Sequence, residues 1–108
     1  TYDLFEAMKH DGLRPRIVKV DGGMVMNNWF SQFLSDVVNV KVLRPKVHET
    51  TALGAAFMAG LKIGAYKSLK DISKNWSLDK KFSPKMKKKS RNLLLHGWSK
   101  AIKRALIN

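Results

Sequence analysis

Two adjacent glycines and two adjacent asparagines stand between a short apolar run and the start of a helical pattern, in Val20-Asp21-Gly22-Gly23-Met24-Val25-Met26-Asn27-Asn28. Glycine permits positive φ angles and lets another molecule approach the backbone. An asparagine amide can both donate and accept hydrogen bonds, as a nucleotide base or ribose requires. Gly22, Gly23 and Asn27 are therefore candidate nucleotide-binding residues. On this segment alone the signal is weak, because many α/β proteins have a double-glycine turn that binds no ligand.

The elements on either side would place this turn at the end of a strand. β-branched residues in Arg16–Val20 predict a strand, and Val40–Leu43 predicts a second strand that closes at Arg44-Pro45. Between them, apolar residues recur at helical spacing, at Trp29, Phe30, Phe33, Leu34, Val37 and Val38. Asn27 or Asn28 would cap that helix. Ligands of α/β sheets bind beyond the carboxyl ends of strands and at helix N-termini, so this β-α-β unit suits an anionic ligand.

The remaining segments predict four more helices. A first helix, with Leu4, Phe5 and Met8 on one side, should stop at His10-Asp11-Gly12. Ala52–Leu61, preceded by the capping hydroxyls of Glu49-Thr50-Thr51, should form a buried helix in which Gly54 and Gly60 allow tight packing on the sheet.

Nearer the C-terminus, Ser68–Trp76 predicts a short amphipathic helix, and Phe82-Ser83-Pro84 breaks the chain. A last helix is expected over about 87–106, with an apolar stripe that should pack against another element; the stripe is Leu94, Trp98, Ile102 and Leu106. A lysine-rich segment covers 80–91.

Several ordered blocks closely resemble the C-terminal part of the glycerol kinases, within the FGGY family of carbohydrate kinases. The blocks are Val20–Trp29, Gln32–Asp36, Arg44-Pro45, Glu49–Ala56 and Gly97-Trp98 followed by a basic helix. The resemblance covers essentially the whole chain. It implies an α/β fold, the C-terminal portion of an actin-like ATPase (ribonuclease H-like) domain, with 1–108 as the C-terminal part of the nucleotide-binding domain.

The resemblance also implies roles for individual residues. Gly23 and Asn27 match positions that contact the adenosine side of ATP or ADP, Gly22 belongs to the same turn, and the helix over 51–61 would pack behind it. ATP would be the co-substrate with Mg²⁺. The catalytic aspartate, the metal ligands and the glycerol-binding residues would lie upstream, so we expect no catalytic residue here. The full-length relatives suggest a homo-oligomer. Lys85–Ser90 departs from the family, which generally carries acidic or mixed residues there.

Other candidates for chemistry have simpler explanations. Asp21, at a strand end, resembles a catalytic base or magnesium ligand, but such a carboxylate more often holds a turn through backbone N–H groups. His10, His48 and His96 have no paired spacing, so we expect no metal site. We expect the three tryptophans, Trp29, Trp76 and Trp98, to pack rather than to stack on bases.

Composition limits the alternatives. With 108 residues, 44% hydrophobic content and no cysteine, the chain has room for one domain, and a soluble, cytoplasmic protein without a membrane span is expected. Its net charge of +13 fits a small basic nucleic-acid-binding protein or simply a lysine-rich surface. No nucleic-acid-binding motif supports the former, so no specific nucleic acid is expected as a partner.

The chain begins at Thr1, directly inside a helical pattern. We therefore expect a piece of a longer kinase that is inactive alone and whose partner is the N-terminal remainder, or else a non-catalytic split-gene product that pairs with an N-terminal kinase half. A unit with two evident strands should expose strand edges and leave apolar surface uncovered at Trp29, Phe33 and Trp98.

Overall fold

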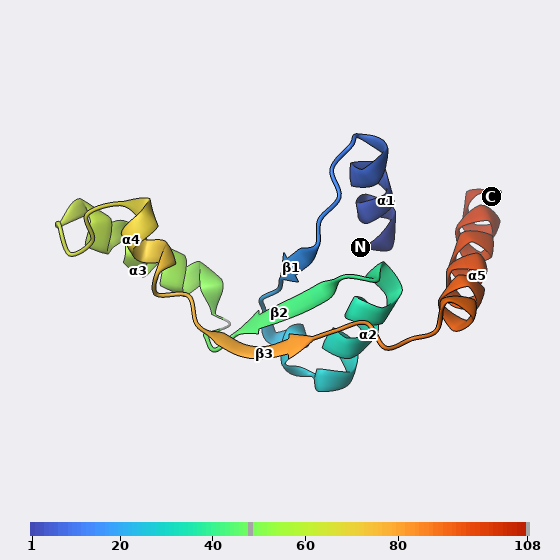
Figure 1. Cartoon of the computed structure of the whole chain (residues 1–108). Coiled ribbons are helices and arrows are strands. Elements are labelled where there is room, and N and C mark those ends of the chain that lie inside the picture. The colour runs from blue at the N-terminus through green and yellow to red at the C-terminus, as the bar shows by residue number, and fades with distance from the viewer. Residues whose placement is uncertain (48, 108) are drawn as a thin grey trace.

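The computed structural model describes residues 1–47 and 49–107. Its elements follow the chain in the order α1 (Tyr2–His10), β1 (Ile17–Lys19), the 3₁₀ helix η1 (Gly23–Met26), α2 (Asn28–Val38), β2 (Lys41–Pro45), α3 (Thr50–Lys62), α4 (Leu69–Ser73), β3 (Leu78–Phe82) and α5 (Lys88–Leu106). A small sheet forms the middle of an elongated molecule that measures 53 × 31 × 27 Å along its principal axes. Helices α3 and α4 project from one end, while α1 and α5 stand at the other (Figure 1).

The sheet has three strands in the order β1-β2-β3. β1 and β2 run parallel, with Ile17 opposite Lys41, and helix α2 connects them. This confirms the predicted β-α-β unit. The predicted closure of the second strand at Arg44-Pro45 was too early, because β2 includes both residues and an irregularity in pairing falls between them.

The third strand, β3, was missed by the sequence analysis. It pairs antiparallel with β2, with Phe82 opposite Val42. Only Phe82 of this strand is buried, and Leu78, Asp79, Lys80 and Lys81 are all exposed. An edge strand can carry charge on both faces, so β3 has no alternation by which sequence could identify it.

Helix α2 is fixed to the sheet by a small apolar core and by buried serines. Val38 at its end packs with Phe5 of α1 and Val40 before β2. Asn39 takes the left-handed conformation (φ 56°) that ends the helix and starts the strand. The fully buried Ser35 hydroxyl donates to the Val40 carbonyl at 2.7 Å and lies 3.2 Å from the Phe82 carbonyl oxygen. One side chain therefore joins the helix to the segments that lead into β2 and out of β3.

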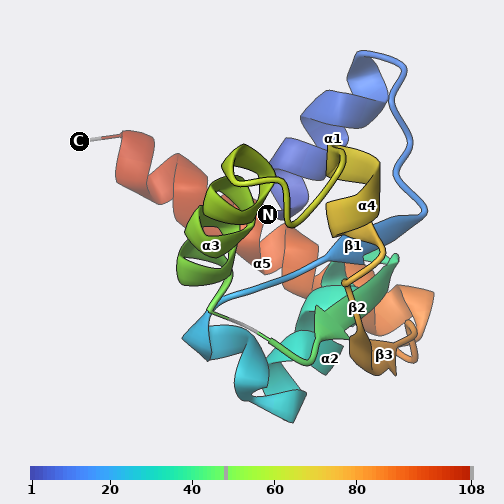
Figure 2. The same ribbon diagram turned by 90° about the vertical axis from the view of Figure 1, so that its left-hand side faces the viewer.

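The predicted burial of the helix over 52–61, which is α3, is wrong for this chain. α3 extends over Thr50–Lys62, and Gly60 is its one buried residue. A Cβ at Gly54 would meet nothing within 4 Å, whereas a Cβ at Gly60 would lie 2.7 Å from the Tyr66 ring. The close approach therefore comes from the loop after α3 and not from the sheet. The helix stands clear of the sheet in two perpendicular views (Figures 1 and 2).

The two end helices follow the expectation more closely. α1 stops before Gly12, whose φ is +88°, and α5 begins at Lys88. Asp36 holds the start of α5: its Oδ1 accepts from the backbone N–H groups of Lys85 (2.7 Å) and Met86 (3.1 Å), and its carbonyl accepts from Arg91 Nε (2.6 Å). α5 nevertheless keeps much of its apolar stripe exposed.

The tryptophans make contacts but are not buried in a core. Trp29 stacks on Phe33 with ring centroids 5.0 Å apart, yet it is 70% exposed. Trp76 lies under the ammonium group of Lys19, 4.4 Å from the ring centroid. Trp98 is 52% exposed, and its indole N–H donates to Asp3 at 2.9 Å. The expected apolar surface is therefore uncovered at Trp29 and Trp98, while Phe33, under the Trp29 ring, is half-buried.

The two glycines of α3 predict opposite effects of the same substitution. Gly54→Ala should raise the free energy of unfolding by about 1 kcal/mol, because alanine favours the helix and the added methyl group meets no neighbour. Gly60→Ala should lower it, because the methyl group would displace the Tyr66 ring. Denaturant unfolding followed by circular dichroism measures both. Gly60→Ala combined with Tyr66→Ala should recover stability relative to Tyr66→Ala alone; a further loss would contradict the contact.

Candidate functional site

The glycine turn is an exposed corner between β1 and α2. Gly22 has φ 91° and ψ 169°, a conformation that is essentially restricted to glycine. Gly23 has no positive φ and begins η1, and a Cβ on either glycine would meet nothing within 4 Å. Gly22 is therefore required by the backbone, while Gly23 leaves open space on the outer side of the turn.

Asn27 ends this turn and caps α2. Its side-chain Oδ1 accepts from the Phe30 backbone N–H at 3.1 Å, and its backbone is extended (φ −72°, ψ 115°). This confirms the predicted cap and shows that Asn27, rather than Asn28, is the N-cap residue of α2. Within the part of the chain that the structure describes, Asn27 Nδ2 has no hydrogen-bond partner, and the residue is exposed. The amide can therefore donate to a ligand while its oxygen caps the helix.

Asp21 holds the turn in a different way from that predicted. Its Oδ2 accepts from the Thr50 hydroxyl at 2.8 Å, rather than from backbone N–H groups of the turn. The predicted capping by Glu49, Thr50 or Thr51 also fails, since Glu49 occupies the N-cap of α3 without a side-chain hydrogen bond. The helix expected to pack behind the turn thus contacts it at its first residue and then projects away.

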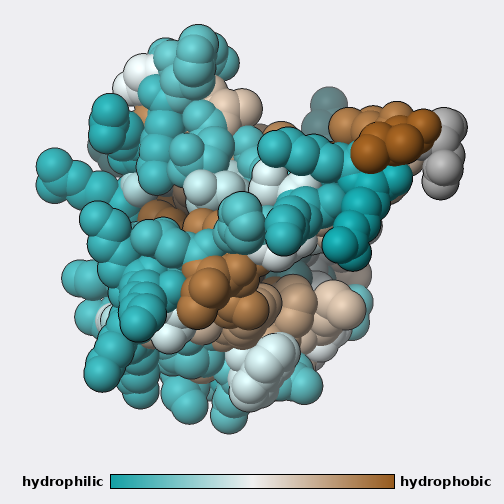
Figure 3. Space-filling view, turned by 90° about the vertical axis from the view of Figure 1, so that its right-hand side faces the viewer, coloured by the Kyte–Doolittle hydropathy of each residue, from teal (hydrophilic) through white to brown (hydrophobic). Residues whose placement is uncertain are grey.

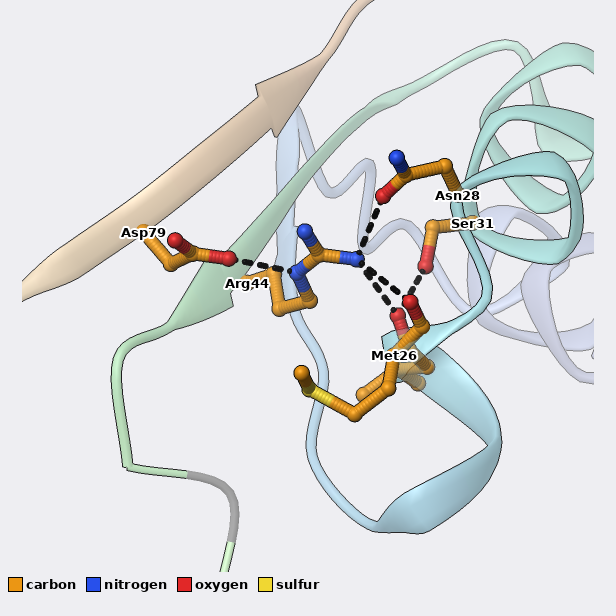
Figure 4. A network of polar contacts seen from close by, with 6 residues as sticks. Met26, Asn28, Ser31, Arg44 and Asp79 are labelled. Carbon is orange, nitrogen blue, oxygen red and sulfur yellow. Dashed lines mark hydrogen bonds and ion pairs between the residues drawn. The ribbon is translucent and has the colours of Figure 1, made fainter.

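Arg44 holds the inner side of the turn, and the sequence analysis did not single it out for this role. Its side chain is only 7% exposed, and its Nε donates to Asp79 Oδ2 of β3 at 2.8 Å. Its Nη1 lies within hydrogen-bond distance of three oxygens: the carbonyls of Val25 (3.0 Å) and Met26 (3.2 Å), and Asn28 Oδ1 (2.9 Å). Figure 4 shows the guanidinium between β3 and η1.

Two further contacts complete this network. The buried Ser31 hydroxyl donates to the same Val25 carbonyl at 2.8 Å (Figure 4). The Arg44 guanidinium also lies over the Phe82 ring, 5.3 Å from its centroid. The turn backbone is therefore fixed from behind by β2, β3 and α2, while its glycine side stays open. The sequence does contain one signal for this role: Arg44 directly continues an apolar strand. A charged residue in such a position is often buried and then needs hydrogen-bond partners.

The other candidates are not brought together. His10 lies on α1 and His96 on α5, and His48 falls outside the described residues. Among residues 1–47 and 49–107, no three histidine, aspartate or glutamate side chains are placed to hold a metal ion. None of the helices in these ranges is long and apolar enough to cross a membrane.

Comparison with known proteins identifies relatives of this arrangement. The family model for the C-terminal domain of the FGGY family of carbohydrate kinases matches residues 1–63. Glycerol kinase 1 of Pseudomonas aeruginosa is 52% identical over 104 residues, and glycerol kinase of Gluconobacter oxydans is 48% identical over 107 residues. These matches cover 96% and 98% of the chain, but the chain spans only about a fifth (21%) of either relative.

Solved structures show the same fold. The crystal structure of Plasmodium falciparum glycerol kinase with ADP matches 98% of the chain and 21% of its own length, with a TM-score of 0.76 and 35% identity. A ligand-bound xylulose kinase from Lactobacillus acidophilus matches 98% of the chain and 22% of its own length, with a TM-score of 0.75. At 22% identity, the latter match concerns the fold alone.

The mixed sheet with its β-α-β unit is thus the C-terminal portion of an α/β, actin-like ATPase domain. The chain belongs to the FGGY family of carbohydrate kinases. The nucleic-acid-binding alternative is not favoured, because the matches over nearly the whole chain are to kinases.

Arg44→Met should lower the free energy of unfolding by about 3 kcal/mol, since it removes a buried charged donor from several acceptors at once. Arg44→Lys should also destabilise, because one ammonium group cannot reproduce the two-sided contact of the guanidinium. Arg16→Met, at an exposed arginine, is the control and should change stability by less than about 0.5 kcal/mol. Equal unfolding midpoints for Arg44→Met and Arg16→Met would show that the network contributes nothing.

Proposed function

We propose that this chain supplies the adenosine side of the nucleotide pocket in an ATP-dependent glycerol kinase, which converts ATP and glycerol to ADP and glycerol 3-phosphate. Residues 1–108 would be the C-terminal part of its nucleotide-binding domain. The glycerol kinases that match nearly the whole chain support this assignment, as does the related structure described as containing ADP.

The observation that carries the proposal is the geometry of the turn from Gly22 to Asn27. It follows a strand end, where ligands of α/β sheets bind, and it faces outward with no Cβ at two successive residues. The Asn27 Nδ2 group adds a directional donor at its far end. A flat adenosine group needs this combination of close backbone approach and one or two directed hydrogen bonds.

In such a kinase, bound ATP provides the phosphoryl group, and catalysis depends on positioning and on charge stabilisation with Mg²⁺. Gly23 would give the adenosine room beside the backbone, and Asn27 would orient it. Arg44 would act behind them, keeping the carbonyls of η1 in place so that the turn does not adjust when the nucleotide binds. The residues for Mg²⁺, glycerol and proton transfer would come from the upstream part of the kinase.

The partners in this proposal are ATP or ADP, glycerol through upstream residues, and the N-terminal remainder of the kinase. The full-length enzyme would be a cytoplasmic homo-oligomer. The exposed apolar side chains, such as Trp29 at 70% exposure, suit a segment that is covered by the rest of a larger protein.

Gly23→Val, made in the full-length kinase that contains this chain, should weaken ATP binding by at least about tenfold, equivalent to 1.4 kcal/mol. Glycerol affinity should stay within about twofold, because the added side chain affects the nucleotide side alone. The melting temperature should change little, since the new Cβ meets no neighbour in this chain. Calorimetric titration with ATP and with glycerol measures both affinities. Asn92→Val, on exposed α5, is the control; unchanged ATP affinity in Gly23→Val would refute the assignment of this turn.

Substitutions of Asn27 should separate its two roles. Asn27→Ala removes the cap and the amide, so it should lower stability by about 1 kcal/mol and also weaken ATP binding several-fold. Asn27→Ser keeps a capping oxygen but lacks the amide, so it should retain stability and lose affinity. Thermal unfolding and ATP titration are measured on the same preparations. If Asn27→Ser binds ATP like the parent protein, Asn27 acts only as a cap.

A further inference from the structure

The positive charge of the chain is concentrated in one part of its sequence. Residues 80–107 contain ten lysine and arginine residues and no aspartate or glutamate, whereas residues 1–79 contain eleven of these cations and eight carboxylates. A general preference for lysine would raise the charge of both parts alike. The segment that includes the end of β3 and the whole of α5 therefore accounts for ten of the thirteen net positive charges.

The cations of α5 lie mainly on the side that faces away from α1 and α2. The opposite side holds the helix in place, because the Trp98 indole donates to Asp3 of α1 at 2.9 Å and Arg91 Nε donates to the Asp36 carbonyl of α2 at 2.6 Å. At about 3.6 residues per turn, four exposed cations fall on the far side of the helix from Trp98: Lys89, Lys100, Lys103 and Arg104. The ion pairs among residues 1–47 and 49–107 involve none of them.

Two large apolar side chains lie among these cations. Leu93 follows Lys89 by one helical turn and is 66% exposed, and Ile107 follows Lys103 by one turn and is 81% exposed. Leu93 also lines an open hollow of about 500 Å³ with charged and polar neighbours on α5. From the α5 side, apolar side chains lie within a largely hydrophilic surface (Figure 3). The basic face of α5 is defined here as Lys89, Leu93, Lys100, Lys103, Arg104 and Ile107.

This combination suits a surface that is anionic outside and apolar beneath. Near an anionic bilayer, lysine and arginine are attracted to the headgroups, while apolar side chains between them enter the boundary with the acyl chains. With 19 residues, α5 is about 28 Å long, so its whole basic face can meet a flat surface at once. A single-stranded nucleic acid would instead gain most from aromatic stacking, and the one tryptophan of α5, Trp98, lies on the opposite side of the helix.

We propose that the basic face of α5 binds the surface of a bilayer that contains anionic phospholipids, and so holds the kinase on a membrane that it does not cross. The lysines and Arg104 would pair with headgroup phosphates, and Leu93 and Ile107 would enter the layer between them. This role goes beyond the proposed function, because it concerns where the kinase is held and involves no residue of the adenosine turn.

Co-sedimentation with vesicles tests the proposal in the full-length kinase that contains this chain. The kinase should sediment with vesicles of phosphatidylcholine mixed with phosphatidylglycerol but not with phosphatidylcholine alone. High salt should release it, because salt screens exposed charges. The triple variant Lys89→Gln, Lys100→Gln and Lys103→Gln should bind the mixed vesicles at least about twentyfold more weakly, since each lysine contributes several-fold.

A second triple variant removes the same charge elsewhere. Lys62→Gln, Lys67→Gln and Lys70→Gln change three exposed lysines at the end of α3 and in α4, and should weaken vesicle binding by less than about twofold because these lysines lie outside the basic face. Thermal unfolding of both triple variants should match that of the parent kinase, since all six side chains are exposed. Equal losses of binding in the two triples would mean that net charge alone acts, and would overturn the proposal.

Leu93→Gln separates a bilayer from other polyanions. It should weaken vesicle binding about fivefold, because the apolar contact with the bilayer is lost, and leave the affinity for a duplex RNA probe within about twofold. Leu69→Gln, at a leucine of α4 that is 65% exposed, is the matched control and should change neither. Unchanged vesicle binding in Leu93→Gln would overturn the proposal. Tighter binding of the RNA probe than of the vesicles at the same salt would assign the face to nucleic acid instead.

These measurements contain no nucleotide, so their outcome is independent of the proposed adenosine site. Vesicle binding that depends on the basic face, together with unchanged ATP affinity in Gly23→Val, would leave this inference standing while the adenosine site fails. Loss of ATP affinity in Gly23→Val without any vesicle binding by the parent kinase would do the reverse.

Discussion

The guanidinium of Arg44 is the contact on which the arrangement of the turn depends. It lies between the sheet and η1, and it donates to Asp79 on one side and to the carbonyls of Val25 and Met26 on the other. A buried cation is tolerated only where nearby acceptors replace its lost hydration. The folded backbone of η1 supplies those acceptors, so the turn and the burial of Arg44 stabilise each other. The outer side of the turn can then remain open without losing its shape.

A second polar residue performs a comparable task at the other end of α2. Asp36 accepts hydrogen bonds from the backbone of Lys85 and Met86, and its own carbonyl accepts from Arg91. α2 is thus joined to the turn through Asn27 and to α5 through Asp36. Because these contacts are directional, they fix the geometry of elements whose apolar contacts are few. The core itself is small, with Phe5, Val38 and Val40 as its buried cluster.

The incomplete burial has a consistent explanation across the molecule. α3 has the small, apolar composition of an enclosed helix but stands mostly exposed, and α5 leaves Trp98 half-exposed. The chain spans about a fifth of the length of the glycerol kinases that it matches. In the longer kinase proposed above, the apolar composition of α3 would match contacts with the rest of that protein, whereas the exposed fractions describe these 108 residues alone.

The sequence by itself determined the local features: the strand-turn-helix order, the Asn27 cap, the stop at Gly12, the start of α5 and the family resemblance. Each depends on residues close together in the chain, through β-branched runs, helical spacing and capping groups. Only the tertiary structure decided that Arg44 holds the turn, that Thr50 binds Asp21, that Leu78–Phe82 pairs with β2, and that Tyr66 rather than the sheet approaches Gly60. Most of these contacts join residues that are distant in the sequence, and the Tyr66 contact depends on the path of the loop after α3. Periodicity and composition do not indicate which distant group will become the neighbour.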